Sequence, residues 1–459
     1  MIEHAAMAEK RELWTGRFGF VLSAMGSAIG LGSIWKFPYE VGANGGAGFI
    51  LLYILGLAVV VFPLMLLEFA IGRRGGSDGV GSLAAVARES GASTRWQLVG
   101  ALGTLTSVLI LSFYSVIGGW ALYYVVATLQ AGLPAPSADA VQARFAAMLA
   151  SPALMTAYHA AFMIATALIV ARGIAGGIER ACKILMPVLL ALVVVLALYS
   201  MSEGDVGAAL KFLFRIDPRS FSAAVALEAL GLGFFSIGVG LAVMIAYGSY
   251  ADHQIDLRSA AIATMAGDTL VSLLAGLAVF PIVFAEHLDP ASGPRLMFVT
   301  LPLAFSRLPF GTAAAVIFFV LLAVAALASA VSLLELPAAF VRRSLRCSRA
   351  WATAITASSC GILGLLSIFS FNILSNWHPL AAIGLPNATA FDLLDDLTSN
   401  VLLPVAGFGL ALFGGWVMLP TALAAELHLA RTGLHLLRLL LRYIVPLAVA
   451  AAAIAAVRF

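Results

Sequence analysis

Two glycine-rich groups within long apolar stretches have the residue types needed to bind a small polar solute. The first is the run Gly26-Ser27-Ala28-Ile29-Gly30-Leu31-Gly32-Ser33, and the second surrounds Phe234-Phe235-Ser236 with four glycines. Glycine lowers helix stability by about 1 kcal/mol relative to alanine, so each group favours an interruption that frees backbone N–H and C=O groups. The alternative is close helix packing through small residues. Asp268 is a separate signal, because an acid inside an apolar segment is costly and typical of a functional site.

The elements that must position these residues are membrane helices. The 459 residues are 62% hydrophobic and 11% charged, with a mean hydropathy of +1.03, whereas soluble domains carry about 25% charged residues. A spanning helix needs about 20 apolar residues. The sequence predicts eleven spans, near 15–38, 46–72, 97–129, 156–171, 177–201, 222–250, 257–286, 309–341, 350–371, 390–418 and 440–457.

The glycine groups interrupt the first and the sixth of these spans, five apart. That spacing predicts a five-helix inverted repeat with the binding site where the repeats meet. The predicted divisions are a cytoplasmic segment at 1–14, repeat one at 15–201, repeat two at 202–418, and a cytoplasmic loop with an eleventh helix at 419–459. The segment 287–308 could hold a short re-entrant helix.

Lysine and arginine are more frequent on the side of the predicted helices that carries the N-terminus. The positive-inside rule then predicts a multi-pass protein of the plasma (inner) membrane with a cytoplasmic N-terminus. With eleven spans, the C-terminus lies outside. The oligomeric state is left open by the sequence.

Composition also argues against several function classes. The net charge is +3 without a long basic block, so a nucleic-acid partner is not expected. Cys182, Cys347 and Cys360 have no metal-binding spacing. No nucleophile–base pair is recognisable, so we expect neither an enzyme nor an organic cofactor. We expect the lipid bilayer to surround the protein.

Several motifs together resemble the neurotransmitter:sodium symporter family, whose structural reference is the bacterial leucine transporter LeuT. The motifs are Arg11-Glu12-Leu13-Trp14, Gly30-Leu31-Gly32-Ser33-Ile34-Trp35-Lys36-Phe37-Pro38, Asn44-Gly45-Gly46, Gly177-Ile178-Glu179-Arg180-Ala181-Cys182-Lys183, Phe234-Phe235-Ser236, Ser329-Ala330-Val331-Ser332-Leu333-Leu334-Glu335 and Phe391-Asp392-Leu393-Leu394-Asp395. The resemblance covers about residues 11–418. It implies an all-α integral membrane protein with a LeuT-like 5+5 inverted repeat, discontinuous helices 1 and 6, and an eleventh helix.

The resemblance implies Na⁺-coupled symport of an amino acid into the cell by alternating access. The N–H groups after the first break and the hydroxyl of Tyr114 would bind the substrate carboxylate. Amine-transporting members are expected to carry an acid where this sequence has Gly30, so the substrate should bring its own carboxylate. The implied pocket is mostly apolar, which favours a neutral, hydrophobic L-amino acid. Its residues are Ala28, Gly30, Leu31, Gly32, Ile110, Tyr114, Phe235, Ser236, Gly238, Leu241, Ser329 and Leu333.

One or two Na⁺ ions are implied in the same way. The first site would use the Ala28 carbonyl, Ser33, Ser236, Asp268 and the substrate carboxylate. The second would use carbonyls of Gly26, Ile29 and Ala325 with the hydroxyl of Ser329. Two positions depart from the family pattern. At the second site, Ala328 stands where the family usually has a residue with a hydroxyl group. At the first site, Ser33 stands where asparagine is more common.

Chloride independence is expected from the same region. Asp268 can itself supply the negative charge that chloride supplies in some relatives. Leu232 stands where the anion site commonly has glutamine, and only Tyr53 is retained.

Gates are implied on both sides of the site. Lys36 would pair with Asp395 outside, above a lid of Tyr114 and Phe235. Arg11 and Trp14 would pack against Tyr250 and Ser249 inside. The family's inner acid is replaced by Arg342-Arg343, which predicts either another acid, such as Asp252, or a loose inner gate.

Two alternatives remain open at this stage. Ala328 keeps a proton-coupled transporter of the same fold in consideration, with Asp268 or Glu335 as the proton carrier. Arg342-Arg343 is the only hint of a sensor that binds an amino acid without transporting it.

Overall fold

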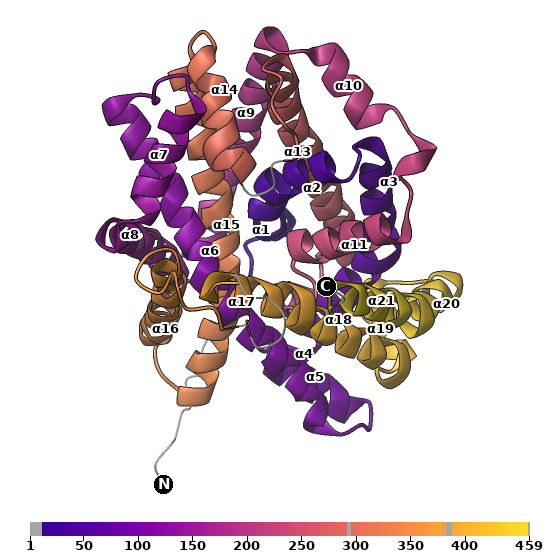
Figure 1. Cartoon of the computed structure of the whole chain (residues 1–459). Helices are drawn as coiled ribbons and strands as arrows, with labels where there is room; N and C mark the ends of the chain where they lie inside the picture. Colours follow the sequence, from indigo (N-terminus) through magenta and orange to yellow (C-terminus); the bar gives the residue numbers. More distant parts are fainter. Residues whose placement is uncertain (1–11, 292–294, 380, 382–387, 458–459) are drawn as a thin grey trace.

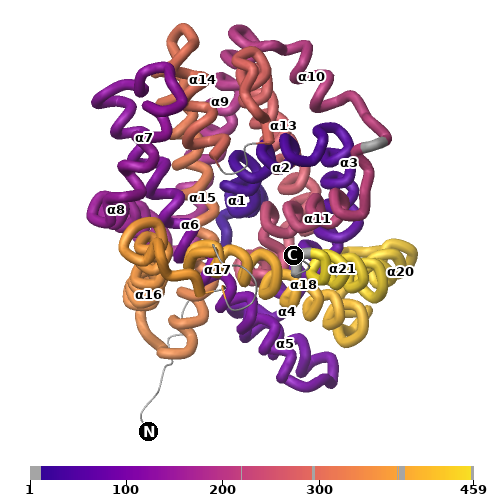
Figure 2. Tube along the Cα trace, viewed as in Figure 1, coloured from indigo at the N-terminus to yellow at the C-terminus, as the bar shows by residue number. Residues whose placement is uncertain are grey.

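The protein is a bundle of long helices, seen in a computed structural model that describes residues 12–291, 295–379, 381 and 388–457 (Figures 1 and 2). Nine helices in these ranges are long and apolar enough to cross a membrane unbroken. They are Ala47–Gly75 (with α3, Ala47–Gly56, and α4, Phe62–Gly75), Thr94–Ala131 (with α6, Gln97–Ala131), Pro152–Ala171 (α8), Ile174–Glu203 (with α9, Arg180–Glu203), Leu257–Ala285 (α13), Gly311–Leu345 (α15), Arg349–Ser370 (α16), Ala390–Val417 (with α17, Ala390–Asp396, and α18, Leu403–Leu412) and Arg431–Ala455 (with α20, Arg431–Leu439, and most of α21, Val445–Val457).

The first span is broken, as the glycine pattern predicted. Helix α1, Arg17–Ala28, stops before Gly30, and a second helical piece, Gly32–Ala43, which includes α2, continues at an angle of 51°. Ile29 at the end of α1 is extended, with φ −80° and ψ 92°. The break therefore falls where the N–H groups of the second piece begin.

The sixth span is broken as well. Helix α11, Ala223–Ile237, ends at Gly238, and α12 begins again at Val243 and runs to Ser249. Gly238 and Gly240 adopt φ values of +74° and +93°, which favour glycine. Gly240 also allows a close approach, because a Cβ there would lie 2.9 Å from the carbonyl oxygen of Leu403.

The other elements lie between the spans. They are α5 (Gly79–Glu89), α7 (Ala138–Leu149), α10 (Val206–Phe214), α14 (Leu301–Arg307) and α19 (Pro420–Leu427). Helix α14 and the turn before it form a short apolar helix at Leu296–Arg307, in the segment where a re-entrant helix was considered.

All eleven predicted segments correspond to these helices, with shifts at their ends. The eleventh begins at Arg431, not near 440, because its first turns are amphipathic and carry arginines that lowered their hydropathy. Helix α1 packs against α9, α13 and α15, near the middle of the bundle in Figure 1. The two breaks face each other there: the hydroxyls of Ser33 and Ser236 lie 3.1 Å apart.

Candidate functional site

A small cavity of about 40 Å³ lies where the two broken helices meet. It is lined by Ser27, Ala28, Gly30, Leu31, Gly32, Ile110, Tyr114, Phe235, Ser236, Gly238, Leu241, Val243, Ser329, Leu333 and Leu403. The structure thus brings together all twelve residues of the expected substrate pocket. It adds Ser27, Val243 and Leu403, which no sequence motif singled out as pocket residues.

The polar end of this cavity is the first break. The N–H of Leu31 donates a hydrogen bond of 3.1 Å to the hydroxyl of Tyr114. Gly30 leaves space between two side chains, because a Cβ there would lie 2.7 Å from the Tyr114 hydroxyl and still closer to Ser329 Oγ. The first N–H groups of a helix have no acceptor within the helix, and together with the positive end of the helix dipole they favour an anion such as a carboxylate at this position.

Oxygen atoms gather around Asp268, which is fully buried in α13. Ser33 and Ser236 donate to its Oδ1 at 2.5 and 3.0 Å, and Tyr53 donates to Oδ2 at 2.7 Å. Three helices besides α13 contribute to this cluster, and Ser236 also lines the cavity. Hydroxyl and carboxylate oxygens are the ligands that a hard cation prefers, so the cluster fits Na⁺ next to the substrate cavity.

A second group of oxygens lies on the other side of the first break. Ser329 Oγ is 3.2 Å from the carbonyl oxygen of Gly26 and 3.1 Å from that of Ser27. Ala328 is buried and brings no side-chain oxygen. Of the residues expected for a second Na⁺ site, Ser329 and Gly26 are thus in contact; Ser27 was not expected.

Glu68 is a functional candidate that lies outside the residues expected from the sequence. Its Oε1 accepts a 2.6 Å hydrogen bond from the N–H of Gly240 in the sixth break. Arg73 binds Glu426 at 2.7 Å. The signal was available, because Glu68 is an acid within an apolar span.

On one side, the central cavity adjoins a larger, aromatic cavity of about 250 Å³. Leu31, Tyr114 and Phe235 line both, so they form the partition. Lys36 and Asp395 line the larger cavity, but among the described residues they form no ion pair within 4.0 Å. The ammonium of Lys36 instead lies 4.5 Å from the centre of the Phe235 ring.

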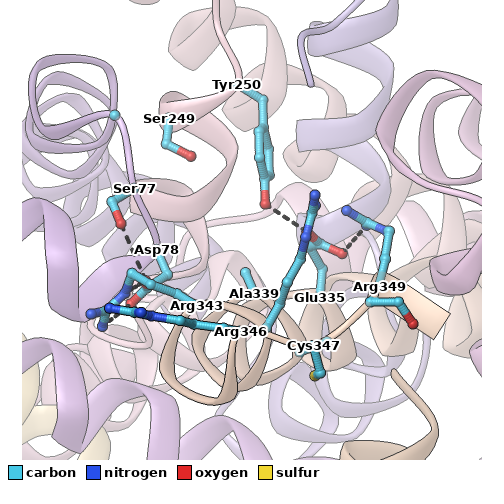
Figure 3. Close-up of a pocket in the computed structure, with 14 residues that line it drawn as sticks. Ser77, Asp78, Ser249, Tyr250, Glu335, Ala339, Arg343, Arg346, Cys347 and Arg349 are labelled. Atoms are coloured by element: carbon cyan, nitrogen blue, oxygen red, sulfur yellow. Dashed lines mark hydrogen bonds and ion pairs between the residues drawn. The ribbon is translucent and has the colours of Figure 1, made fainter. Parts of the chain in front are cut away.

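On the opposite side lies a polar cavity of about 620 Å³. Above it, Trp14 donates from its indole N–H to the carbonyl of Tyr247 at 3.0 Å and packs edge-on against Tyr250. Tyr250 donates to Glu335 at 2.7 Å, and Glu335 pairs with Arg349 (Figure 3). Arg343 pairs with Asp78 in the same view.

Glu12 completes this inner network. Its carboxylate lies 2.9 Å from Arg342 and 2.9 Å from Arg349, and it accepts from the N–H of Ile174 at 3.0 Å. Burial alone would raise the pKa of Glu12, but Arg349, Ile174 N–H and Arg342 outweigh it and hold the pKa below the ordinary 4.5.

These contacts correct the expectation for the inner gate. Glu12 and Glu335 supply the acids, so the arginines at 342 and 343 do not leave the closure loose. Asp252 caps its own turn, accepting from the N–H of Gln254 at 2.9 Å. Arg11 lies outside the described residues.

A search against models of protein families matches the sodium:neurotransmitter symporter family over residues 11–143 and 140–374. The chain belongs to this family. It is accordingly a sodium-dependent transporter and not an enzyme.

Individual relatives of this symporter agree with the assignment. An uncharacterized sodium-dependent transporter of Bacillus subtilis is 36% identical over 96% of this chain and 97% of the relative. An uncharacterized sodium-dependent transporter of Haemophilus influenzae is 30% identical over 89% of this chain and 90% of the relative. The bovine sodium-dependent dopamine transporter is 27% identical over 72% of this chain and 53% of its own.

Among solved structures, the crystal structure of MhsT in complex with L-phenylalanine superposes with a TM-score of 0.89. That match has 40% sequence identity and covers 97% of this chain and all of the other. The symporter therefore has the LeuT-like fold of broken helices that its motifs implied.

Proposed function

We propose that this symporter takes up a neutral, hydrophobic L-amino acid together with Na⁺ by alternating access, without needing chloride. The observation that carries the proposal is the central cavity, with an anion-binding helix break at one end and mainly apolar side chains elsewhere. The relative MhsT, whose crystal structure contains L-phenylalanine, supports this substrate class.

The substrate carboxylate would lie at the first break, bound by the N–H groups near Leu31 and Gly32 and by the Tyr114 hydroxyl. Gly30 brings no competing acid. The side chain would extend toward Ile110, Leu241 and Leu333 and the flexible break at Gly238. The cavity of about 40 Å³ must widen to admit it, and both breaks supply that freedom.

One Na⁺ would lie between the substrate carboxylate and the Asp268 cluster, bound by Ser33, Ser236 and the Ala28 carbonyl. A shared carboxylate oxygen makes each ligand raise the affinity of the other. A second Na⁺ would use Ser329 with carbonyls of Gly26, Ile29 and Ala325. Since Ala328 lacks a hydroxyl, we expect this second site to be the weaker one.

Transport requires the two closures to open in turn. The Tyr114–Phe235 partition with Lys36 and Asp395 would open outward, and the Trp14–Tyr250 closure with Glu12 and Glu335 inward. In the proposed orientation the N-terminus is cytoplasmic in the plasma membrane and the C-terminus is outside. The carboxylate of Asp268 would take the place of chloride.

Binding of radiolabelled L-phenylalanine and L-leucine to the purified symporter, in sodium, potassium or choline, tests the proposal. Sodium alone should support binding, and gluconate in place of chloride should change nothing. Tyr114→Phe should weaken binding at least about tenfold, because a hydrogen bond to a charged group contributes about 1.5–3 kcal/mol. Stronger competition by lysine or glutamate than by leucine or tryptophan would contradict the substrate class.

Proton coupling is the second candidate, since Asp268 is buried beside the cavity and Ala328 weakens one cation site. It predicts uptake that needs a pH gradient and persists in choline. A non-transporting sensor would bind sodium and substrate but show no counterflow in proteoliposomes.

A further inference from the structure

Two arginines of the last membrane helix share one acceptor. Arg438 and Arg442 lie one turn apart in α20 (Arg431–Leu439) and the segment that follows it. Arg442 Nε lies 2.6 Å, and Arg438 Nη2 3.4 Å, from the carbonyl oxygen of Gly415. Gly415 is in the last turn of its helix, where carbonyls lack helical donors and the dipole is negative.

That carbonyl cannot satisfy both guanidinium groups. In the described part of the chain, no carboxylate lies within 4.0 Å of either arginine, and the buried Nε of Arg438 has no acceptor. Glu426, in the preceding helix α19, is already bound by Arg73 at 2.7 Å and Arg74 at 3.4 Å. A buried charged donor without an acceptor is costly, so this pair of arginines lacks an anion.

The pair lies at the depth of the lipid headgroups. Helix α21 ends at Val457, and the 20 residues from Arg438 to Val457 rise about 30 Å, the thickness of the hydrocarbon core. Arg442 is about 6 Å deeper and can extend toward the same level. This end of the helix is on the same side as Arg73 and Arg74, through their contacts with Glu426.

Exposed aromatic and aliphatic side chains lie near the two arginines. Trp416, Leu439 and Tyr443 are 54%, 41% and 50% exposed. The Arg442 guanidinium lies 4.9 Å from the centre of a Trp416 ring, and Trp416 packs edge-on against Tyr443. Tryptophan and tyrosine are enriched at this level of a membrane. The exposed apolar surface favours an anion that carries acyl chains over a free ion.

We propose that Arg438 and Arg442, with Trp416, bind the phosphate of an anionic phospholipid at the junction of the last two membrane helices. A phosphodiester offers several oxygens to the unsatisfied N–H groups. A choline headgroup places a positive charge beside both arginines, whereas a glycerol headgroup does not. The site therefore selects phosphatidylglycerol-type lipids over phosphatidylcholine.

Gly415 fits this role through its lack of a side chain. A Cβ there would lie 2.9 Å from Arg442 Cγ and 3.0 Å from its Cα. Any larger residue would push the last helix away and separate the two guanidinium groups from their shared carbonyl.

Native mass spectrometry of the full-length protein in detergent, titrated with phosphatidylglycerol or phosphatidylcholine, tests the site. Each basic residue near a membrane surface contributes about 1 kcal/mol, or about fivefold in affinity. Arg438→Gln and Arg442→Gln should each weaken phosphatidylglycerol binding about fivefold, and the double variant more than twentyfold. Arg431→Gln is the matched control, because it removes the same charge from the exposed start of the same helix.

Equal binding of the two lipids by the wild type, or an equal loss in Arg431→Gln, would overturn the proposal. Displacement of the lipid by millimolar glycerol phosphate would show a free-phosphate site instead. If the double glutamine variant does not fold, Arg438→Lys with Arg442→Lys keeps the charge. It should retain the preference for phosphatidylglycerol, and loss of that preference without loss of folding would count against a charge-based site.

Discussion

On one side of the central cavity, Phe235 and Tyr114 separate it from an aromatic cavity, where the described residues Lys36 and Asp395 form no direct ion pair. On the other side, carboxylates pair with arginines. The outer closure consists of packed apolar side chains, with the Lys36 ammonium over the Phe235 ring. The inner closure connects the chain before α1 to α15 and α16 through Glu12 and Glu335. In the proposed transport cycle, the two sides would therefore close by different physical means.

These two closures should respond differently to mutation. Removing one partner of a buried ion pair leaves the other charge uncompensated, which costs about 3–5 kcal/mol. Removing a cation from a ring costs about 0.5–2 kcal/mol. The inner side should therefore be the easier one to force open.

The largest effect is expected from Glu335→Gln. It leaves the Arg349 guanidinium with Glu12 as its remaining carboxylate, so inward opening should become at least tenfold more frequent. Cys182 reports it, because this residue of α9 is 1% exposed and its sulfur faces Gly26 of α1, where a Cβ would lie 3.0 Å from it. With Cys347→Ser and Cys360→Ser, maleimide labelling of Cys182 should accelerate accordingly.

The matched control is Glu335→Gln combined with Arg349→Gln, which removes both charges. Labelling of Cys182 should return toward the wild-type rate. If the single variant labels at the wild-type rate, the ion pair does not hold the inner side closed.

The next effect tests the outer closure. Phe235→Leu removes the ring shared by both outer and central cavities, and should weaken substrate binding at least about fivefold, since an aromatic contact contributes about 1 kcal/mol beyond its buried area. Labelling of Cys182 should stay unchanged. An accelerated labelling of Cys182 would mean that the two closures are not separate.

A pH effect is expected on the inner side. The pKa of Glu12 is lower in the folded protein than its ordinary value of 4.5, so its stabilisation is complete above about pH 4.5 and lost as the pH falls through the folded value. The Tm difference between wild type and Glu12→Gln should therefore be constant near neutral pH and shrink below pH 4.5. A difference that grows in acid would give the pKa shift the opposite sign.

The smallest effect is expected from Lys36→Gln. Loss of the cation over Phe235 should change substrate affinity by less than about fivefold. Comparison with Asp395→Asn and the double variant measures any coupling between these residues. Coupling above about 1 kcal/mol would show that they pair in another state of the transport cycle.

The sequence predicted the fold well because its signals were strong. The broken helices follow from glycine spacing, and Asp268 stands out as a lone acid in an apolar span. Once the resemblance identified the relevant positions, all twelve pocket residues came together around one cavity.

The inner network was not predicted because it depends on distances that the sequence does not encode. Glu12 is 330 and 337 positions away from Arg342 and Arg349. Likewise, Glu68 binds a backbone N–H in a helix break 172 positions away. Which charged side chains pair, and which backbone N–H group an acid binds, is decided only by the folded structure.

The tight space around Gly30 limits how this transporter can evolve. An amine carrier needs a fixed acid near this position, yet even one added carbon would lie 2.7 Å from the Tyr114 hydroxyl and 3.0 Å from Ser329 Cβ. A single mutation to aspartate would therefore block the site before it created a new specificity. An evolutionary path from the proposed amino-acid substrate to an amine must first make room at Ser329 or Tyr114, so the order of mutations on that path is constrained.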